Sequence, residues 1–376
     1  MANTLTNLTP DLYEALDTVS RELVGMIPAV TLDANAERAA KGQTIRSAVA
    51  PASAAADITP AQKAPDTGDQ TVTNKTLSIS KSRGVPIRYN GEEQRGLNTG
   101  GGYNSLLQNQ FAQAMRTLTN EVEADLAGLY VEASRAYGTA GTTPFGTAGD
   151  FSDASNALKI LKDNGAPLTN NQLVVSSAAG ASMLGLQSRV DVQGNDSMLR
   201  QGVMLSTAGL DIRESAQSYA HTKGTGSSYV TDGIQAKDAT VIGLTGGTGT
   251  VVAGDVVTFA GDANKYLVTS ALSGGNITIA APGLQEAIAS GVAMTVGNDY
   301  AANMAFNRSA IVLVTRAPAR PVEGDLAEDV MLMTDPRSGI TFEVSMYKEY
   351  RQVHFEVALA WGVSAIKPEH MAVLLG

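Results

Sequence analysis

The residues most able to do chemistry in this sequence are its three histidines, His221, His354 and His370. Histidine can serve as a general base or as a metal ligand near neutral pH. No two of them have the H-x-x-x-H spacing of a helical zinc site, and the chain has no Cys to supply thiolate ligands. We expect His354 on the polar face of a strand, beside Glu356, and His221 in a surface loop. The spacing therefore favours neither a zinc hydrolase nor a catalytic histidine.

Two adjacent acid pairs, Glu92-Glu93 and Glu328-Asp329, are the next candidates for acid–base chemistry. Neighbouring side chains point apart on a strand or a helix, so two such carboxylates do not converge on one substrate atom. We interpret both pairs as solvated surface. The sequence also lacks the G-x-S-x-G turn that exposes a hydrolase serine.

A glycine-rich run at residues 243–249 (GLTGGTG) has the composition of a phosphate-binding loop but not its pattern. A dinucleotide loop needs G-x-G-x-x-G before a helix, and a P-loop needs G-K-S/T. We expect a turn there. Asn276-Ile277-Thr278 matches a glycosylation acceptor, which has no meaning without secretion. We predict no catalytic, cofactor-binding or metal-binding residues, no cofactor and no enzyme activity.

Composition excludes several classes of protein. The chain has 376 residues, 43% of them hydrophobic, which rules out disorder throughout and suggests two or three domains. The 27 Lys and Arg against 37 Asp and Glu give a net charge of −10, so a basic nucleic-acid-binding surface is not expected. No apolar stretch is long enough to span a membrane, and the N-terminus does not have the pattern of a secretory signal. We expect a soluble protein made in the cytoplasm.

The first ninety residues are predicted to be an arm and an extended loop. Thr9-Pro10-Asp11 has the residue types of a helix start, and the helix is expected to end at Gly25 or Pro28. Its apolar stripe has little core of its own: Leu12, Leu16, Val19 and Leu23. Residues 47–66, rich in Ala and Pro, are expected to be an extended linker. Residues 71–89 are β-prone but polar on both faces, so we expect a hairpin that needs a neighbouring subunit.

The strongest periodic signal lies at residues 103–137. Its stripe predicts one helix of about 50 Å: Leu107, Phe111, Met115, Leu118, Val122, Leu126, Leu129, Ala133 and Tyr137. The expected polar face carries Arg116, Asn120, Glu121, Glu123 and Asp125. A helix this long would act as a strut.

The second half alternates helices and strands and then becomes β-rich. A helix is expected at Ser155–Asn164 and a strand at residues 172–175. Residues 223–298, dense in Gly and Thr, are predicted to form an inserted small β-barrel or sandwich. Its expected strands are residues 239–244, 256–260, 266–269 and 276–280. A central strand is expected at residues 311–314, followed by a long hairpin with arms at 342–346 and 353–363 and a turn at 348–351.

Together these elements resemble the major capsid proteins of tailed bacteriophages, with the Hong Kong 97 (HK-97) type α+β fold, and in particular the P-22-like branch. The resemblance is carried by the N-terminal arm and by four further segments: residues 85–89 (VPIRY), 118–123 (LTNEVE), 253–261 (AGDVVTFAG) and 358–369 (ALAWGVSAIKPE). These segments occur in the same order as in that family, and they extend over nearly the whole chain.

The resemblance implies a role for each region. An arm and linker (1–66) and an extended loop (67–98) would contact neighbouring subunits. A peripheral domain would contain the spine helix (99–149) and the terminal sheet (321–376). An axial domain (150–222 with 299–320) would carry the inserted β domain (223–298).

The resemblance also implies partners and a location. The protein would form hexamers and pentamers of a shell, with a scaffolding protein and a portal during assembly. It would enclose double-stranded DNA without sequence-specific binding and would contact no membrane. It would assemble in the host cytoplasm and end in the virion. An encapsulin-type compartment shell and, with less support, a β-rich adhesin remain alternatives.

Overall fold

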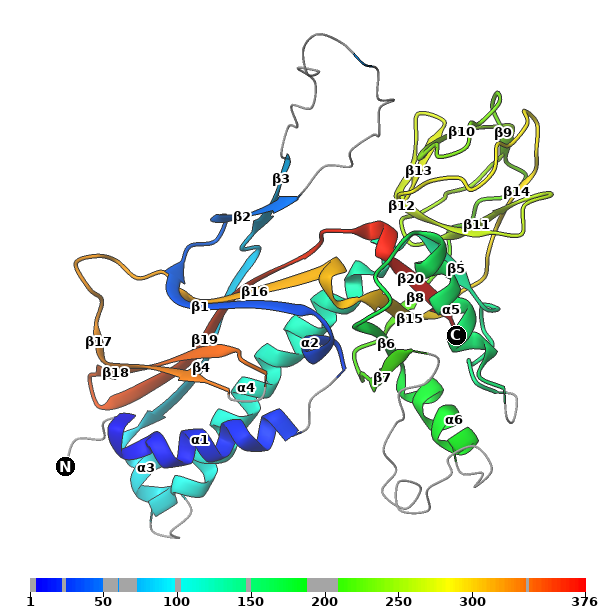
Figure 1. The fold of residues 1–376 in the computed structure, drawn as a ribbon. Coiled ribbons are helices and arrows are strands. Elements are labelled where there is room, and N and C mark those ends of the chain that lie inside the picture. Colours follow the sequence, from blue (N-terminus) through cyan, green and yellow to red (C-terminus); the bar gives the residue numbers. More distant parts are fainter. Residues whose placement is uncertain are drawn as a thin grey trace.

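The computed structural model describes residues 5–21, 25–49, 60, 73–98, 103–146, 150–187, 209–335 and 338–376. Most of the predicted linker 47–66 lies outside these ranges. The described residues form an α+β fold with a six-stranded sheet, a twelve-stranded sheet and a two-stranded ribbon (Figure 1). The mixed helix and strand composition expected from the sequence is confirmed.

The six-stranded sheet has the order β1-β16-β19-β18-β17, with β4 on the other side of β19. Its strands are β1 (Thr31–Ala39), β4 (Lys81–Asn90), β16 (Ile311–Pro318), β17 (Ala327–Thr334), β18 (Thr341–Glu349) and β19 (Gln352–Ala365). The predicted central strand is β16, which lies between β1 and β19. The predicted long hairpin is β18 and β19, and Arg351 in its turn adopts a positive φ of 59°.

Helix α4 (Tyr103–Ala127) covers one face of this sheet and is shorter than predicted. Six members of the predicted stripe, from Leu107 to Leu126, are buried on it. The chain then forms a short 3-10 helix, η1 (Gly128–Glu132), and strand β5 (Arg135–Tyr137). Strand β5 pairs with two other strands, and the pairing of Tyr137 with Leu374 holds Tyr137 in extended structure. The 25-residue helix is about 37 Å long instead of about 50 Å.

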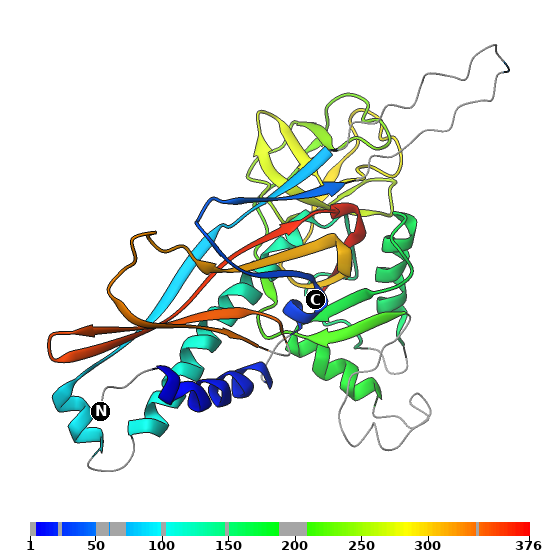
Figure 2. The same cartoon turned by 60° about the vertical axis from the view of Figure 1, so that its left-hand side comes forward.

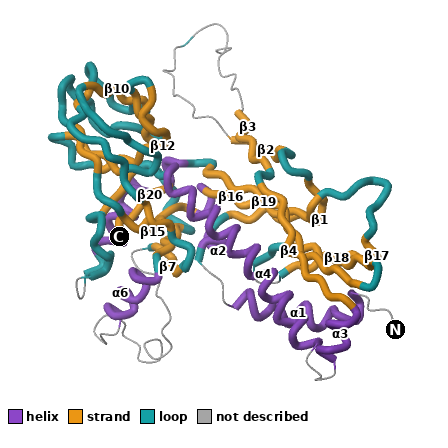
Figure 3. Tube along the Cα trace, turned by 180° about the vertical axis from the view of Figure 1, so that it is seen from behind, coloured by secondary structure: helices purple, strands orange, loops and turns teal. Residues whose placement is uncertain are grey.

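Helix α1 (Leu5–Arg21) starts four residues before the predicted Thr9 and carries Pro10 inside it. Its stripe of Leu12, Leu16 and Val19 is fully buried, because α1 packs along α4 and against β17 (Figure 3). The expectation that this helix lacks a core within its own subunit is therefore wrong. Leu23 lies outside the described residues. Helix α2 (Met26–Ala29) then leads into β1.

The polar segment 71–89 is not one hairpin. Strand β3 (Thr73–Ser78) pairs with β2 (Thr44–Val49) in a separate ribbon, whereas β4 pairs along ten residues of β19. The alternation of Ile87 and Tyr89 with polar residues explains the difference, because both side chains point into the α4 core. Helix α3 (Gly91–Asn98) follows β4.

The second sheet begins in the middle of the chain. Its first part contains β5, β6 (Asn171–Val175), β7 (Leu210–Glu214), β8 (Tyr219–His221), β15 (Tyr300–Asn307) and β20 (Met371–Leu375). The predicted helix is α5 (Ser152–Asp163), which packs on β20, β5 and β15, and α6 (Ser177–Gln187) follows β6. Both expected elements of this region are therefore present.

Two strands lie in a different sheet from the one that the sequence grouping suggested. Residues 299–320 split, because β15 belongs to the twelve-stranded sheet and β16 to the six-stranded sheet. Residues 321–376 split in the same way, since β20 leaves β19 and lies between β15 and β5. Short 3-10 turns, η2 (Arg308–Ala310) and η3 (Pro368–His370), make the two crossings.

The predicted insertion forms a lobe with its own apolar core (Figures 1 and 2). Its strands are β9 (Val230–Thr231), β10 (Val241–Thr245), β11 (Val256–Phe259), β12 (Lys265–Ser273), β13 (Asn276–Ile279) and β14 (Met294–Val296). The four predicted strands match β10 to β13, and β12 extends four residues beyond its predicted end. The start of β12 pairs with β5, so the lobe continues the twelve-stranded sheet.

Candidate functional site

His221 is buried instead of lying in a surface loop, which corrects the sequence-based prediction. It ends β8, and its Nε2 lies 2.9 Å from Oδ1 of Asp255 while its Nδ1 lies 2.8 Å from the Tyr130 hydroxyl. The backbone N–H groups of Gly224 and Val252 also donate to Asp255. Burial raises the pKa of the Tyr130 hydroxyl, which keeps it a neutral donor.

This His221–Asp255–Tyr130 cluster ties three segments together. Tyr130 belongs to η1, His221 to β8 and Asp255 to the lobe, and the Tyr300 hydroxyl donates to the Gly254 carbonyl at 2.6 Å. All four side chains are buried. His221 lines none of the pockets described below, and no serine or threonine hydroxyl is hydrogen-bonded to it in the described part of the chain. The geometry is that of a structural joint between the lobe and the second sheet.

The other two histidines also have structural positions. His354 lies half-buried on β19, between Arg88 of β4 and Tyr347 of β18, as the strand pattern predicts. His370 is buried in η3, and its Nδ1 has no hydrogen-bond partner among the described residues. Burial lowers the pKa of His370 below its usual value, so its neutral form is favoured.

Glu123 and Asp125 are not on a solvent-facing side of α4, contrary to prediction. Glu123 is fully buried and accepts hydrogen bonds from the backbone N–H groups of Met26 (3.2 Å) and Ile27 (2.8 Å) and from the Ser215 hydroxyl (3.0 Å). Burial raises the pKa of the Glu123 carboxyl. Its position directly after Val122 of the apolar stripe was the available sequence signal.

Asp125 joins α4 to the sheet. Its Oδ2 accepts a hydrogen bond from Nε1 of Trp361 at 2.8 Å, and its Oδ1 pairs with Nζ of Lys81 at 2.7 Å. Trp361 is completely buried, so its indole N–H requires a partner inside the protein. The sequence contained no signal for this contact, because it joins residues 236 positions apart.

The two acid pairs have separate structural uses. Glu93 and Asn90 form a reciprocal capping box at the start of α3, since each side chain accepts from the other's backbone N–H, at 2.9 and 2.7 Å. Glu328 is exposed and pairs with Lys348 at 2.7 Å. Neither pair brings two carboxylates together over one site, which agrees with the sequence interpretation.

The glycine-rich run 243–249 begins as the end of β10, and its residues 246–249 form the predicted turn. Gly246 and Gly249 have positive φ values of 74° and 87°. A Cβ on Gly247 would lie 2.2 Å from the Tyr229 ring, so this glycine allows the ring to pack against the turn. Asn276-Ile277-Thr278 lies in β13, with Ile277 buried.

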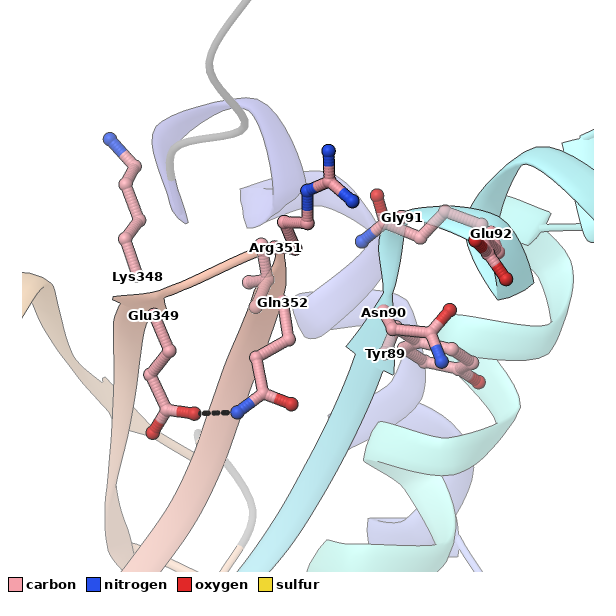
Figure 4. A pocket seen from close by; sticks show the side chains of 10 residues that line it. Tyr89, Asn90, Gly91, Glu92, Lys348, Glu349, Arg351 and Gln352 are labelled. Carbon is pink, nitrogen blue, oxygen red and sulfur yellow. Dashed lines mark hydrogen bonds between the residues drawn. The ribbon is translucent and has the colours of Figure 1, made fainter.

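A pocket of about 670 Å³ lies at the end of the six-stranded sheet where β4 meets the β18–β19 turn (Figure 4). Glu349 and Gln352 hydrogen-bond across that turn. The charged residues that line the pocket are two cations, Lys348 and Arg351, and two anions, Glu92 and Glu349. This balance favours neither an anionic nor a cationic ligand.

The face of the six-stranded sheet opposite α4 carries a polar network. Arg320 pairs with Glu343 at 2.8 Å and donates twice to Asp325, each time at 2.9 Å. Arg38 contacts the same buried Glu343. Within the described residues no group of three or more His, Asp or Glu has a metal-binding arrangement, and no helix is long and apolar enough to cross a membrane.

No protein-family model and no curated protein sequence matches this chain. Among solved structures, the chain is similar to the capsid of the cyanophage P-SCSP1u, with 10% identity over 92% of this chain and 86% of that chain, and a TM-score of 0.48. It is similar to a structure from Mycobacterium phage Che8, with 14% identity over 90% and 88% of the two chains and a TM-score of 0.43. It is also similar to a virus-like particle from Pyrococcus furiosus, with 11% identity over 97% and 98% of the two chains and a TM-score of 0.45.

Proposed function

We propose that this chain is the major capsid protein of a tailed phage, a structural protein without enzyme activity that self-assembles into an icosahedral shell around double-stranded DNA. The proposal joins the sequence resemblance to one observation of the structure. That observation is the two-stranded ribbon β2–β3, which extends away from the body of the subunit (Figures 1 and 2).

The ribbon has little support from its own subunit. In the described part of the chain β2 and β3 pair only with each other, over six residue pairs. A small apolar cluster at the base of the ribbon contains Leu77, Ile79, Val314 and Ala360. An isolated two-stranded ribbon is marginally stable in water, and its unpaired edges favour contact with another chain. A neighbouring subunit would supply the missing surface.

A second feature favours contacts between subunits. The loop between β16 and β17 exposes Val322 and Leu326 by 99% and 89%, and the β18–β19 turn exposes Tyr350 by 90%. The two hydrogen bonds from Arg320 to Asp325 hold this loop in place. Large apolar side chains held in contact with water are typical of association surfaces.

Each region would then have its own role in assembly. The arm and linker (1–66) and the extended loop (67–98) would contact neighbours. The peripheral domain would contain 99–149 and 321–376, and the axial domain 150–222 and 299–320, with 223–298 as the inserted domain. We place β16 with the peripheral sheet and β20 with the axial sheet in this proposal, because of their strand partners.

The proposed partners are copies of this chain in hexamers and pentamers, a scaffolding protein and a portal. The DNA would be enclosed without sequence-specific binding. Assembly would take place in the host cytoplasm and the final location would be the virion.

Negative-stain microscopy and analytical ultracentrifugation of the purified chain, alone and with a scaffolding protein, test the proposal. We expect closed or aberrant shells of megadalton mass. A variant in which residues 46–75 are replaced by a short Gly-Ser turn should fold but form no shells. A wild-type monomer that persists at micromolar concentration with scaffolding protein or crowding agents would contradict the proposal. Shells isolated from the natural source should contain DNA, whereas an encapsulin-type shell would contain protein cargo.

A further inference from the structure

A second pocket, of about 390 Å³, lies where the lobe joins the second sheet. Three segments line it: residues 135–139 from β5 onward, one face of α5, and residues 263–265 at the start of β12. The pairing of β5 with β12 brings the first and third segments together, and α5 packs against β5. The pocket therefore depends on tertiary structure.

The charge of this pocket is opposite to that of the whole chain. Its lining contains Arg135, Lys159 and Lys265 but no Asp or Glu, although the chain has a net charge of −10. Asp163 lies outside the lining, 3.1 Å from Nζ of Lys159 and 3.6 Å from Nη2 of Arg135. Asp262 accepts from Asn264 and Tyr266. Asp163 thus offsets part of three positive charges, and Asp262 is engaged by neutral donors.

Arg135 is the most buried of the three cations and keeps one donor without an acceptor, whereas Lys265 donates to the Gly138 carbonyl and Lys159 pairs with Asp163. Only 4% of Arg135 is exposed, and its Nη atoms donate to the amide oxygens of Asn264 at 2.9 Å and Asn164 at 3.1 Å. Its Nε is buried and has no hydrogen-bond partner among the described residues. A buried guanidinium N–H without an acceptor is unfavourable, and an oxyanion beside it would supply one.

We propose that this pocket binds a small molecule carrying a phosphate group. Tetrahedral phosphate oxygens accept from the guanidinium of Arg135 and from the ammonium groups of Lys159 and Lys265, and Asn156 and Thr139 complete a polar lining. The volume accommodates a ligand larger than phosphate itself. Because the pocket spans β5, α5 and the lobe, the bound ligand would hold the lobe against the second sheet.

Titration calorimetry of the full chain with inorganic phosphate, at ionic strength matched with chloride, tests this site. We expect binding and a rise in Tm with phosphate relative to chloride. Lys265→Gln should weaken binding about tenfold, since one charged hydrogen-bond donor is lost. Lys159→Gln should weaken it about threefold, because its side chain is 68% exposed and already paired with Asp163.

Lys162→Gln is the matched control, because Lys162 is exposed on the same helix and does not line the pocket. It should leave phosphate affinity unchanged. Lys159→Gln and Lys162→Gln should unfold at the wild-type temperature in chloride. Lys265→Gln also loses a hydrogen bond to the Gly138 carbonyl, so its Tm in phosphate is compared with its own Tm in chloride, which separates loss of binding from loss of structure. Equal weakening by Lys162→Gln and Lys265→Gln, or no difference between phosphate and chloride, overturns the proposal.

A short oligothymidylate separates two sources of the phosphate group. If the oligonucleotide and inorganic phosphate compete for the pocket in the wild-type chain and do not compete in Lys265→Gln, the site is supported. That result would also identify a nucleic-acid strand as the source of the phosphate group. Binding of the oligonucleotide without any binding of inorganic phosphate overturns the small-molecule proposal. None of these readouts requires shell formation, so they succeed or fail independently of the proposed capsid function.

Discussion

The core on α4 and the core of the lobe enclose apolar side chains in two different ways. The α4 core collects residues from α1, α4, β4, β18 and β19, and two of its members, Leu8 and Trp361, are 353 positions apart in the chain. The lobe core comes from one continuous stretch, Tyr229 to Met294. The lobe core can therefore form from residues close in the chain, whereas the α4 core forms only when segments from both ends of the chain pack on the helix.

Both cores use carboxylates to join neighbouring elements. On α4, the buried Glu123 accepts from the start of α2 and the half-buried Asp125 from Trp361, and in the lobe the buried Asp255 contacts His221 of β8. The lobe core also depends on close turns, since Gly247 packs directly under the Tyr229 ring. Disruption of the first core should therefore affect the whole subunit, and disruption of the second should stay local.

The largest expected effect is a charge placed in the α4 stripe. Leu118→Asp puts an unpaired carboxylate where the native side chain is 1% exposed, so it should cost about 3–5 kcal/mol and collapse the soluble yield. Thr117→Asp, one residue away on the exposed face, should cost less than about 0.5 kcal/mol. Urea unfolding of both variants makes the measurement. Equal tolerance at the two positions would refute the assignment of the buried face.

Loss of a long-range polar contact should rank second. Glu123→Ala leaves the buried N–H groups of Met26 and Ile27 without their acceptor, at a cost of about 2–3 kcal/mol. Glu121→Gln, which removes a half-exposed pair with Arg83, should cost about 0.5 kcal/mol or less. The free energy of unfolding is measured for both variants. Similar values would show that Glu123 is not a structural link.

A local effect is expected in the lobe. Gly247→Ala places a methyl group against the Tyr229 ring and should destabilise the lobe by about 1–2 kcal/mol. Thr245→Ala, at the exposed last residue of β10, should have little effect. Native-state hydrogen exchange should show lobe amides opening more easily in Gly247→Ala while α4 amides remain protected. If the amides of the lobe and of residues 103–127 exchange in one cooperative step, the two cores do not unfold independently and this prediction is wrong.

The smallest effect concerns pH. Because burial lowers the pKa of His370 from 6.5 in the folded chain, the unfolded chain takes up a proton first as the pH falls. Stability from this group is present above pH 6.5 and is lost as the pH falls below it. His370→Gln should remove that part of the slope and run parallel to wild type between pH 7 and 8.5. A slope unchanged by the substitution would contradict a buried neutral imidazole.

Much of the secondary structure was predictable because it depends on local pattern. The spacing from Leu107 to Leu126 identified the buried face of α4, and alternation identified β18 and β19. The glycine turns marked the limits of the lobe strands β10, β11 and β13 to within two residues. These features follow from the geometry of a helix or a strand, which a short window of sequence contains.

The errors occurred where distant segments compete for the same residues. Tyr137 continues the helical spacing, yet its pairing with Leu374 of β20 holds it in a strand. His221 is polar and next to a glycine-rich segment, yet Asp255 and Tyr130 enclose it. The absence of catalytic residues was a prediction from spacing and remains one.

The stripe of α4 and the turns of the lobe follow from neighbouring residues, and the acidic balance follows from composition, so a reader of the chain alone could derive all three. Contacts between distant segments were needed to bury the stripe of α1, to direct Glu123 and Asp125 toward other elements and to bring Arg135, Lys159 and Lys265 to one pocket. Burial and hydrogen-bond satisfaction depend on which surfaces meet. Those contacts join positions such as Asp125 and Trp361, whose relation no local pattern encodes.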